Sequence, residues 1–205
     1  MNWEYGMPKF DRLKRNFFAR DTETVAKDIL GKYLVRETKQ GKMVGKVIEV
    51  EAYLGTNDKA SHTYNHKKTE KTKTMYEAPG TWYVYYIYGV YFCLNIITEK
   101  KGVPCAVFIR GLYPIEGVDL MKKNRSVKLG KHYKNLLDGP SKLCQAFKIN
   151  KENFNGKDSC APNSKMYFTE GESINKENII LGTRIGIDYA EEDKERLLRF
   201  KLQEV

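Results

Sequence analysis

Two glutamates and a tyrosine at a spacing of two residues could do acid–base chemistry. Glu49, Glu51 and Tyr53 lie in the run EVEAY, so on an extended strand their side chains share one face. Water-facing glutamates are the ordinary explanation, favoured about two to one from the pattern alone. A partly buried carboxylate beside aromatic rings is, however, a plausible general base. The pattern alone leaves both interpretations open.

An aromatic run follows later in the chain. Tyr83–Tyr88 and Tyr91–Ile97 favour β-structure on either side of Gly89, which predicts a hairpin. Such aromatic strands usually pack in a core. The turn at Gly89 leaves Tyr88 near the tip, where an aromatic ring on a basic protein can stack on bases or wedge between base steps.

Cationic side chains offer a third candidate. Residues 57–77 are polar and rich in Lys and Thr, which is typical of a solvated loop, although Lys67 and Lys71 could also grip phosphates. Arg110 ends a predicted apolar strand and therefore needs an anionic partner, either structural or catalytic. His62 alone is most often an ordinary hydrogen-bonding histidine.

The cysteines do not indicate a metal. Cys93, Cys105, Cys144 and Cys160 contain no CxxC pair, and with three histidines they form no metal-ligand pattern. We predict neither a structural disulfide nor a metal site.

The elements that would position these residues are mostly strands. Asp21 predicts the cap of a helix over Thr22–Leu30, and Gly139-Pro140-Ser141 opens a second helix through Phe147. Alternation along the strand Met43–Tyr53 predicts two faces: Val44, Ile48, Val50 and Ala52 on one, and Met43, Val47, Glu49, Glu51 and Tyr53 on the other. Further strands are expected at Tyr33–Glu37, Cys105–Arg110, Met166–Thr169, Ile179–Ile187 and Leu197–Leu202, and a short helix at Ile115–Lys123. Local hairpins outnumber strand–helix–strand crossovers, so we predict an α+β fold with an antiparallel sheet.

Composition limits the partners. The chain of 205 residues fits one domain, 1–205, in which residues 1–14 are expected to be poorly ordered or to lie on the surface. A net charge of +10 attracts polyanions, and nucleic acid is the commonest. No apolar run approaches the length of a membrane span, so we expect a soluble intracellular protein.

Several motifs occur in one order along nearly the whole chain. They are Glu49–Gly55, His62, Met75, Pro79-Gly80, Tyr83–Gly89, Cys93-x-Asn95, Ala106–Pro114, Glu116-Gly117, Gly139–Ala146, Arg184–Asp188 and Arg199-Phe200. Together they resemble the alkyladenine, or 3-methyladenine, DNA glycosylase family, and they indicate a bacterial member. The resemblance implies one domain built on a curved, open-barrel-like antiparallel sheet with surrounding helices and a protruding aromatic β-hairpin.

The resemblance also implies an activity and roles for residues. The expected activity flips alkylated or deaminated purines out of duplex DNA and hydrolyses the N-glycosidic bond, without AP lyase activity, as a monomer with no cofactor and no metal. Glu51 would activate water beside Arg110, and a backbone carbonyl near Ile185–Ile187 would assist. The remaining implied residues are the base pocket Tyr53, His62, Tyr85, Cys93, Asn95 and Phe108, the DNA wedge Tyr88, and the DNA-backbone contacts Lys67, Thr69, Lys71, Tyr91 and Lys142. The expected location is the bacterial cytoplasm, or the nucleus if the source is eukaryotic.

Departures from the family pattern affect substrate range more than activity. Lysines replace the usual arginines after His62, Val90 stands where methionine is common, and Phe108 where leucine is common. Two alternatives remain: a DNA- or RNA-binding module without catalysis, and a ribosome-associated protein of similar charge. The first predicts binding without base release, and the second predicts that structured RNA binds better than lesion-bearing DNA.

Overall fold

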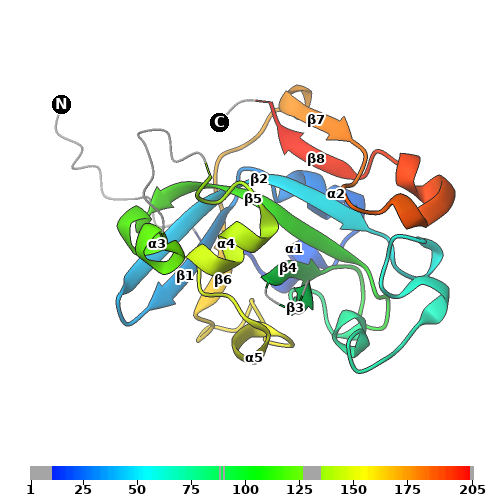
Figure 1. Ribbon diagram of the computed structural model, residues 1–205, viewed down its shortest axis with the longest axis horizontal. Coiled ribbons are helices and arrows are strands. Elements are labelled where there is room, and N and C mark those ends of the chain that lie inside the picture. Colours follow the sequence, from blue (N-terminus) through cyan, green and yellow to red (C-terminus); the bar gives the residue numbers. More distant parts are fainter. Residues whose placement is uncertain (1–10, 88, 90, 127–134, 204–205) are drawn as a thin grey trace.

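The computed structural model describes residues 11–87, 89, 91–126 and 135–203. Its strands form a single curled antiparallel sheet in the order β3-β4-β5-β2-β1-β6, and β8 pairs with both β2 and β7 (Figure 1). The expected α+β class and curved antiparallel sheet are therefore confirmed. The strands are β1 (Tyr33–Thr38), β2 (Gly41–Tyr53), β3 (Trp82–Ile87), β4 (Tyr91–Ile97), β5 (Ala106–Glu116), β6 (Met166–Thr169), β7 (Ile179–Gly182) and β8 (Arg199–Leu202).

Short helices surround this sheet. The Asp21 side chain accepts a hydrogen bond from the Thr24 amide at 2.8 Å, and Pro140 stands in the first turn of α4, so both predicted helix starts are confirmed. The helices are α1 (Arg15–Phe18), α2 (Thr22–Asp28), α3 (Val118–Arg125), α4 (Pro140–Ala146) and α5 (Lys151–Phe154). The 3-10 helices are η1 (Gly55–Asn57), η2 (Tyr64–His66), η3 (Lys73–Tyr76), η4 (Lys176–Asn178) and η5 (Asp188–Glu195).

A β-bulge divides the central strand β2. Its register with β5 shifts on either side of Glu49. Because a bulge inserts an extra residue, the side-chain alternation changes phase there. Met43 and Val47 before the bulge and Val50 and Ala52 after it all reach one hydrophobic core. The predicted faces of this strand were therefore wrong, since Met43 and Val47 do not share a face with the catalytic candidates.

Three predicted boundaries also differ from the structure. Strand β5 continues to Glu116, so the predicted helix starts only at Val118 and Arg110 lies within the strand. Strand β7 ends at Gly182, because the chain then turns in towards β2. Leu13 is buried and its amide bonds to the Phe168 carbonyl, so residue 13 is not part of a loose surface segment; residues 1–10 lie outside the described residues.

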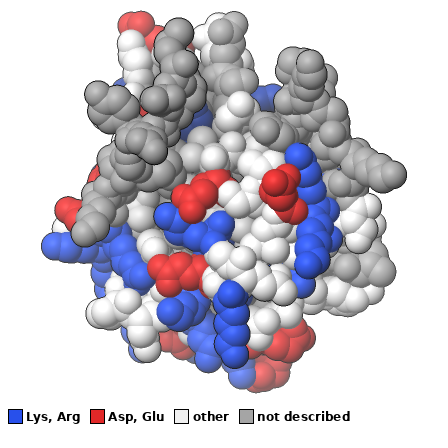
Figure 2. Space-filling model, turned by 90° about the vertical axis from the view of Figure 1, so that its left-hand side faces the viewer, with Lys and Arg blue, Asp and Glu red and all other residues white. Residues whose placement is uncertain are grey.

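Charge is mixed on the face that carries α3 and the β1–β2 turn. Figure 2 shows this face, where Lys and Arg side chains alternate with Asp and Glu. Two of its ion pairs join neighbouring chain segments: Lys42 with Glu116 at 3.1 Å and Lys165 with Glu37 at 3.4 Å. Among the described residues of this face, positive charges are therefore interspersed with negative ones.

Candidate active site

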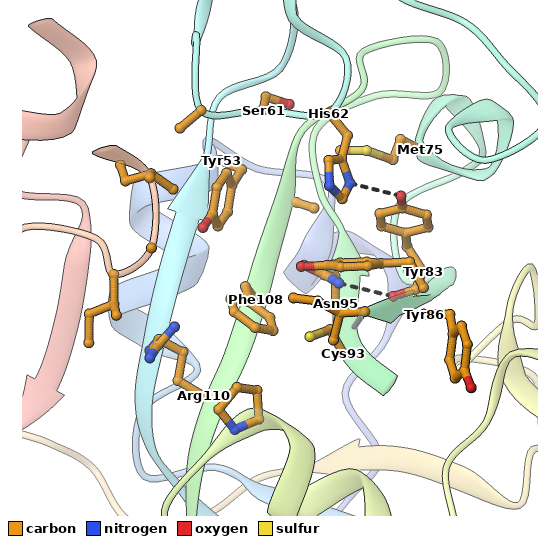
Figure 3. A pocket seen from close by; sticks show the side chains of 18 of the residues that line it. Tyr53, Ser61, His62, Met75, Tyr83, Tyr86, Cys93, Asn95, Phe108 and Arg110 are labelled. Carbon is orange, nitrogen blue, oxygen red and sulfur yellow. Dashed lines mark hydrogen bonds between the residues drawn. The ribbon is translucent and has the colours of Figure 1, made fainter. Parts of the chain in front are cut away.

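One cavity collects the side chains that the sequence singled out. Its volume is about 370 Å³, within the range of roughly 300–1,000 Å³ that small-molecule pockets occupy. Arg110 lines it, as do all six residues expected in a base pocket (Figure 3). Those six are Tyr53, His62, Tyr85, Cys93, Asn95 and Phe108.

Glu51 lies at the edge of the cavity, where two hydrogen bonds and an ion pair hold its carboxylate. The residue is fully buried. Its Oε2 accepts a hydrogen bond from the Tyr53 hydroxyl at 2.9 Å, and its Oε1 accepts one from the Ile185 amide at 2.8 Å. The Arg110 guanidinium lies 3.2 Å from Oε1. Because Tyr53, Ile185 and Arg110 all line the cavity, the carboxylate is fixed at its edge.

Opposing effects set the proton affinity of this carboxylate. Burial raises the pKa of Glu51 above its ordinary value, while Arg110, the Ile185 amide and the Tyr53 hydroxyl act in the opposite direction. Burial, and then the Glu51 charge, raise the pKa of Tyr53, so its hydroxyl stays protonated and remains a donor. A carboxylate that is more basic than usual but still hydrogen-bonded as an anion suits general base chemistry.

Glu49, two residues earlier, pairs with two arginines. Its Oε1 lies 3.2 Å from Arg110 Nε and 3.3 Å from Arg199 Nη1. Arg110 therefore spans the two glutamates, with Nε towards Glu49 and Nη1 towards Glu51. This geometry fixes the plane of the guanidinium.

Aromatic rings and a histidine form the opposite side. The His62 Nδ1 lies 3.0 Å from the Tyr83 hydroxyl, and its ring meets that of Tyr85 edge-on, with centroids 4.6 Å apart. Burial, with Lys71 and Lys67 nearby, lowers the pKa of His62 to about 4, so the imidazole is neutral at physiological pH. Burial also keeps the phenol of Tyr85 protonated, by raising its pKa.

The floor of the cavity comes from paired strands. Asn95 on β4 is opposite Tyr83 on β3, and its amide nitrogen donates to the Tyr83 carbonyl at 3.1 Å. Phe108 on β5 pairs with Asn95 and meets the Tyr53 ring at 6.3 Å. Burial raises the pKa of Cys93 to about 11, so this thiol remains uncharged. Strand register therefore determines which side chains face the cavity.

Sequence reasoning missed several lining residues. Tyr83 had been weighed only as part of an aromatic run, and the family motif covered Ile185 without indicating that its amide holds the carboxylate. Tyr189, mostly exposed, donates to the Ala60 carbonyl at 3.2 Å on the rim. A buried ion pair between Arg184 and Asp58 was also unforeseen. A backbone amide has no side-chain signature, so only the structure could reveal it.

The expected DNA-backbone residues are spread over three segments. Lys67, Thr69 and Lys71 are exposed, and Lys71 also lines the cavity. Tyr91 is exposed at the start of β4, and Lys142 on α4 pairs with the Asp138 carboxylate at 2.9 Å. The expected wedge Tyr88 lies outside the described residues.

Three further features hold for the described part of the chain. The four cysteines are all free. No group of three or more His, Cys, Asp or Glu side chains is placed to hold a metal ion. None of the helices has the length and apolar character needed to cross a membrane.

Known proteins resemble almost the whole chain. The family model described as methylpurine-DNA glycosylase (MPG) matches residues 16–205. A protein of Clostridium novyi (strain NT) is 50% identical over 200 residues, covering 94% of this chain and 96% of the relative. A protein of Clostridium perfringens (strain 13 / Type A) is 46% identical with the same coverage, and both are provisionally named 3-methyladenine DNA glycosylase. The chain therefore belongs to the methylpurine-DNA glycosylase family.

Proposed function

We propose that this chain is a monofunctional DNA glycosylase that removes alkylated or deaminated purines and leaves an abasic site for base excision repair. Family membership supports the glycosylase activity. The observation that carries the mechanism is the buried carboxylate of Glu51, held by Arg110, Tyr53 and the Ile185 amide at the edge of a base-sized cavity.

Glu51 is the general base of this proposal. Its Oε1 accepts a hydrogen bond from the Ile185 amide and forms the ion pair with Arg110, whereas its Oε2 accepts only the bond from the Tyr53 hydroxyl, so Oε2 retains a lone pair for a water molecule. Glu51 takes a proton from that water as the water attacks the anomeric carbon of the sugar. The same negative charge stabilises the oxocarbenium character of the transition state. Burial raises the pKa of Glu51, and the charge of Arg110 opposes this effect and favours the ionised form that the mechanism needs.

The cavity receives the purine after it has left the duplex. Flipping costs a few kcal/mol, and stacking against Tyr53, Tyr85 and His62 offsets part of it. Alkylation at N3 or N7 gives the purine a positive charge, which both weakens its glycosidic bond and favours contact with the faces of tyrosine rings. Asn95 is the proposed residue that excludes the amino group of normal guanine, and its side chain is held by a hydrogen bond to the Tyr83 carbonyl. Tyr88 remains our prediction for the side chain that fills the gap in the duplex.

The proposal also covers the oligomeric state, the location and the contacts to the DNA backbone. We expect a monomer that acts without a cofactor, on double-stranded DNA in the bacterial cytoplasm. Lys67, Thr69, Lys71, Tyr91 and Lys142 are the proposed contacts to the DNA backbone. No lysine serves as a nucleophile in this scheme, so cleavage of the strand is not expected.

Base release from defined duplexes tests the function. We would compare the parent protein with Glu51→Gln on one duplex containing hypoxanthine and on another containing 7-methylguanine. The variant should lose at least about 10²-fold in the rate of base release while keeping its affinity for the lesion. Strand breaks should appear only after alkali treatment.

Glu49→Gln is the matched control, because it makes the same chemical change two residues earlier on the same strand. It weakens a contact to Arg110 but leaves the Glu51 carboxylate in place, so its loss of activity should be much smaller than that of Glu51→Gln. Release by Glu51→Gln within a few-fold of the parent would remove Glu51 from the mechanism. Tight binding without release by the parent would favour a non-catalytic DNA-binding module, and preference for undamaged RNA at matched salt would favour an RNA-handling protein.

A further inference from the structure

Lys71 is placed differently from the other lysines of its loop. It lines the cavity, with Nζ 3.4 Å from His62 Nε2 and 5.3 Å from the centre of the Tyr85 ring. Lys73, two residues on, instead bonds to the Glu70 carboxylate at 2.6 Å. Among the described residues, no carboxylate forms an ion pair with Lys71. Its charge is therefore available to whatever occupies the cavity.

The ammonium group lies on the side of the cavity that would hold the base. Figure 3 shows His62 and Arg110 on opposite sides of the cavity. Lys71 contacts His62, whereas Arg110 contacts Glu51. Attack on the sugar would take place beside Glu51, so Lys71 faces the purine rather than the reacting carbon.

Hydrogen bonding fixes what this side can offer a ligand. An ammonium group only donates, so the contact of Lys71 makes His62 Nε2 the acceptor. The neutral imidazole then carries its proton on Nδ1 and donates it to the Tyr83 hydroxyl. Lys71 thus has further N–H donors that can turn towards the cavity, next to the Tyr85 face.

We propose that Lys71 is a specificity-determining residue that favours neutral purine lesions with free acceptor atoms over cationic alkylated purines. This inference rests on the proposed function and deepens it. Hypoxanthine presents O6 and N7 as acceptors for the ammonium group. A purine alkylated at N7 has lost the N7 acceptor. It also carries a positive charge, which the ammonium group repels. By lying over Tyr85, Lys71 also competes for the ring face that a cationic base would use.

The test measures kcat/KM on two duplexes, one with hypoxanthine and one with 7-methylguanine. In Lys71→Gln, the ratio of hypoxanthine to 7-methylguanine release should fall by about tenfold, because the repulsive charge disappears and a shorter, neutral amide replaces the stronger ammonium donor. Lys71→Arg keeps the charge and should keep most of the preference of the parent. Lys73→Gln is the matched control: it removes one charge from the same loop and should leave the ratio unchanged.

Two results would overturn the inference. One is an equal loss on both duplexes in Lys71→Gln together with a shallower salt dependence, which would assign Lys71 to the DNA backbone alone. The other is a borohydride-trapped DNA adduct that disappears in Lys71→Gln, which would make Lys71 a nucleophile. Failure of the proposed function is distinguishable, because the parent would then release neither base; release of both with an unchanged ratio contradicts only the role of Lys71.

Discussion

The two sides of the cavity are held in place by different forces. On one side, β2 and β5 pair Glu51 with Phe108 and Tyr53 with Ala106, so backbone hydrogen bonds fix the wall. On the other side, residues 57–77 are arranged by short 3-10 turns and by hydrogen bonds between their own hydroxyl groups, such as Thr69 to Thr72. Residues of the loop such as Thr69 and Thr72 therefore support the base side without a direct bond to the strands that hold the carboxylate.

A buried ion pair joins the two sides. The Arg184 guanidinium binds the Asp58 carboxylate at 2.5 and 2.8 Å and donates to the Ala52 carbonyl on β2. Asp58 also accepts from the amides of Leu54 and Ala60. Arg184 directly precedes Ile185, whose amide holds the catalytic candidate, so this pair links the loop, the strand and the carboxylate.

Removing one partner of this pair should have the largest effect. Asp58→Asn leaves the Arg184 charge buried without its counterion, so the free energy of unfolding should fall by about 3–5 kcal/mol. Urea denaturation of the parent and the variant measures it. Lys59→Met is the control, since it breaks only contacts to the exposed Glu191 and Glu192 and should change stability little. An equal loss in the free energy of unfolding for the two substitutions would mean that the buried pair does not connect the two sides of the cavity.

The protonation state of His62, on the side of the cavity that would hold the base, can be tested by the pH dependence of stability. His62 has a pKa of about 4 in the folded protein against 6.5 ordinarily, so the unfolded chain takes up its proton first as the pH falls. The stability due to neutral His62 is complete above pH 6.5 and is lost between pH 6.5 and 4, by up to about 3 kcal/mol. Urea denaturation at pH 7 and 4.5 should therefore show a smaller loss in His62→Gln than in the parent. The same pH dependence in both proteins would contradict a buried neutral histidine.

The effect of Arg110 on Glu51 can be tested by the pH dependence of base release. Arg110 lowers the pKa of Glu51, so Arg110→Gln should raise that pKa and move the rise of kcat to higher pH. At neutral pH the expected loss is about tenfold, and part of it should return under alkaline conditions. Arg199→Gln is the control, because Arg199 contacts Glu49 and the Thr183 carbonyl. A pH profile of Arg110→Gln that matches the parent would show that Arg110 does not tune Glu51.

Local chemistry made some elements predictable from the sequence. The Asp21 cap, the Pro140 start and the β3–β4 hairpin around Gly89 depend on neighbouring residues, which a sequence displays directly. The residues around the cavity were instead identified through the family motifs. Six of them do line one cavity, although strand periodicity alone would not have brought His62 to Tyr85.

Other features depend on long-range contacts and were not predictable. Apolar residues occur at both odd and even positions of β2, so their pattern is compatible with either face and conceals the bulge at Glu49. The bond between Ile185 and Glu51 joins residues 134 positions apart in the chain. The role of Lys71 at the cavity follows from how its loop folds back on His62 and Tyr85.

The bulge in β2 determines which side chains of the central strand face the core and which face the cavity. If the strand kept its present length but alternated regularly from Val47 onwards, every side chain after the bulge would change face. Glu51 would then be directed into the hydrophobic core and Val50 towards the cavity, with the strand itself still able to pair. Placing the carboxylate at the cavity therefore depends on the extra residue of the bulge as much as on the glutamate itself.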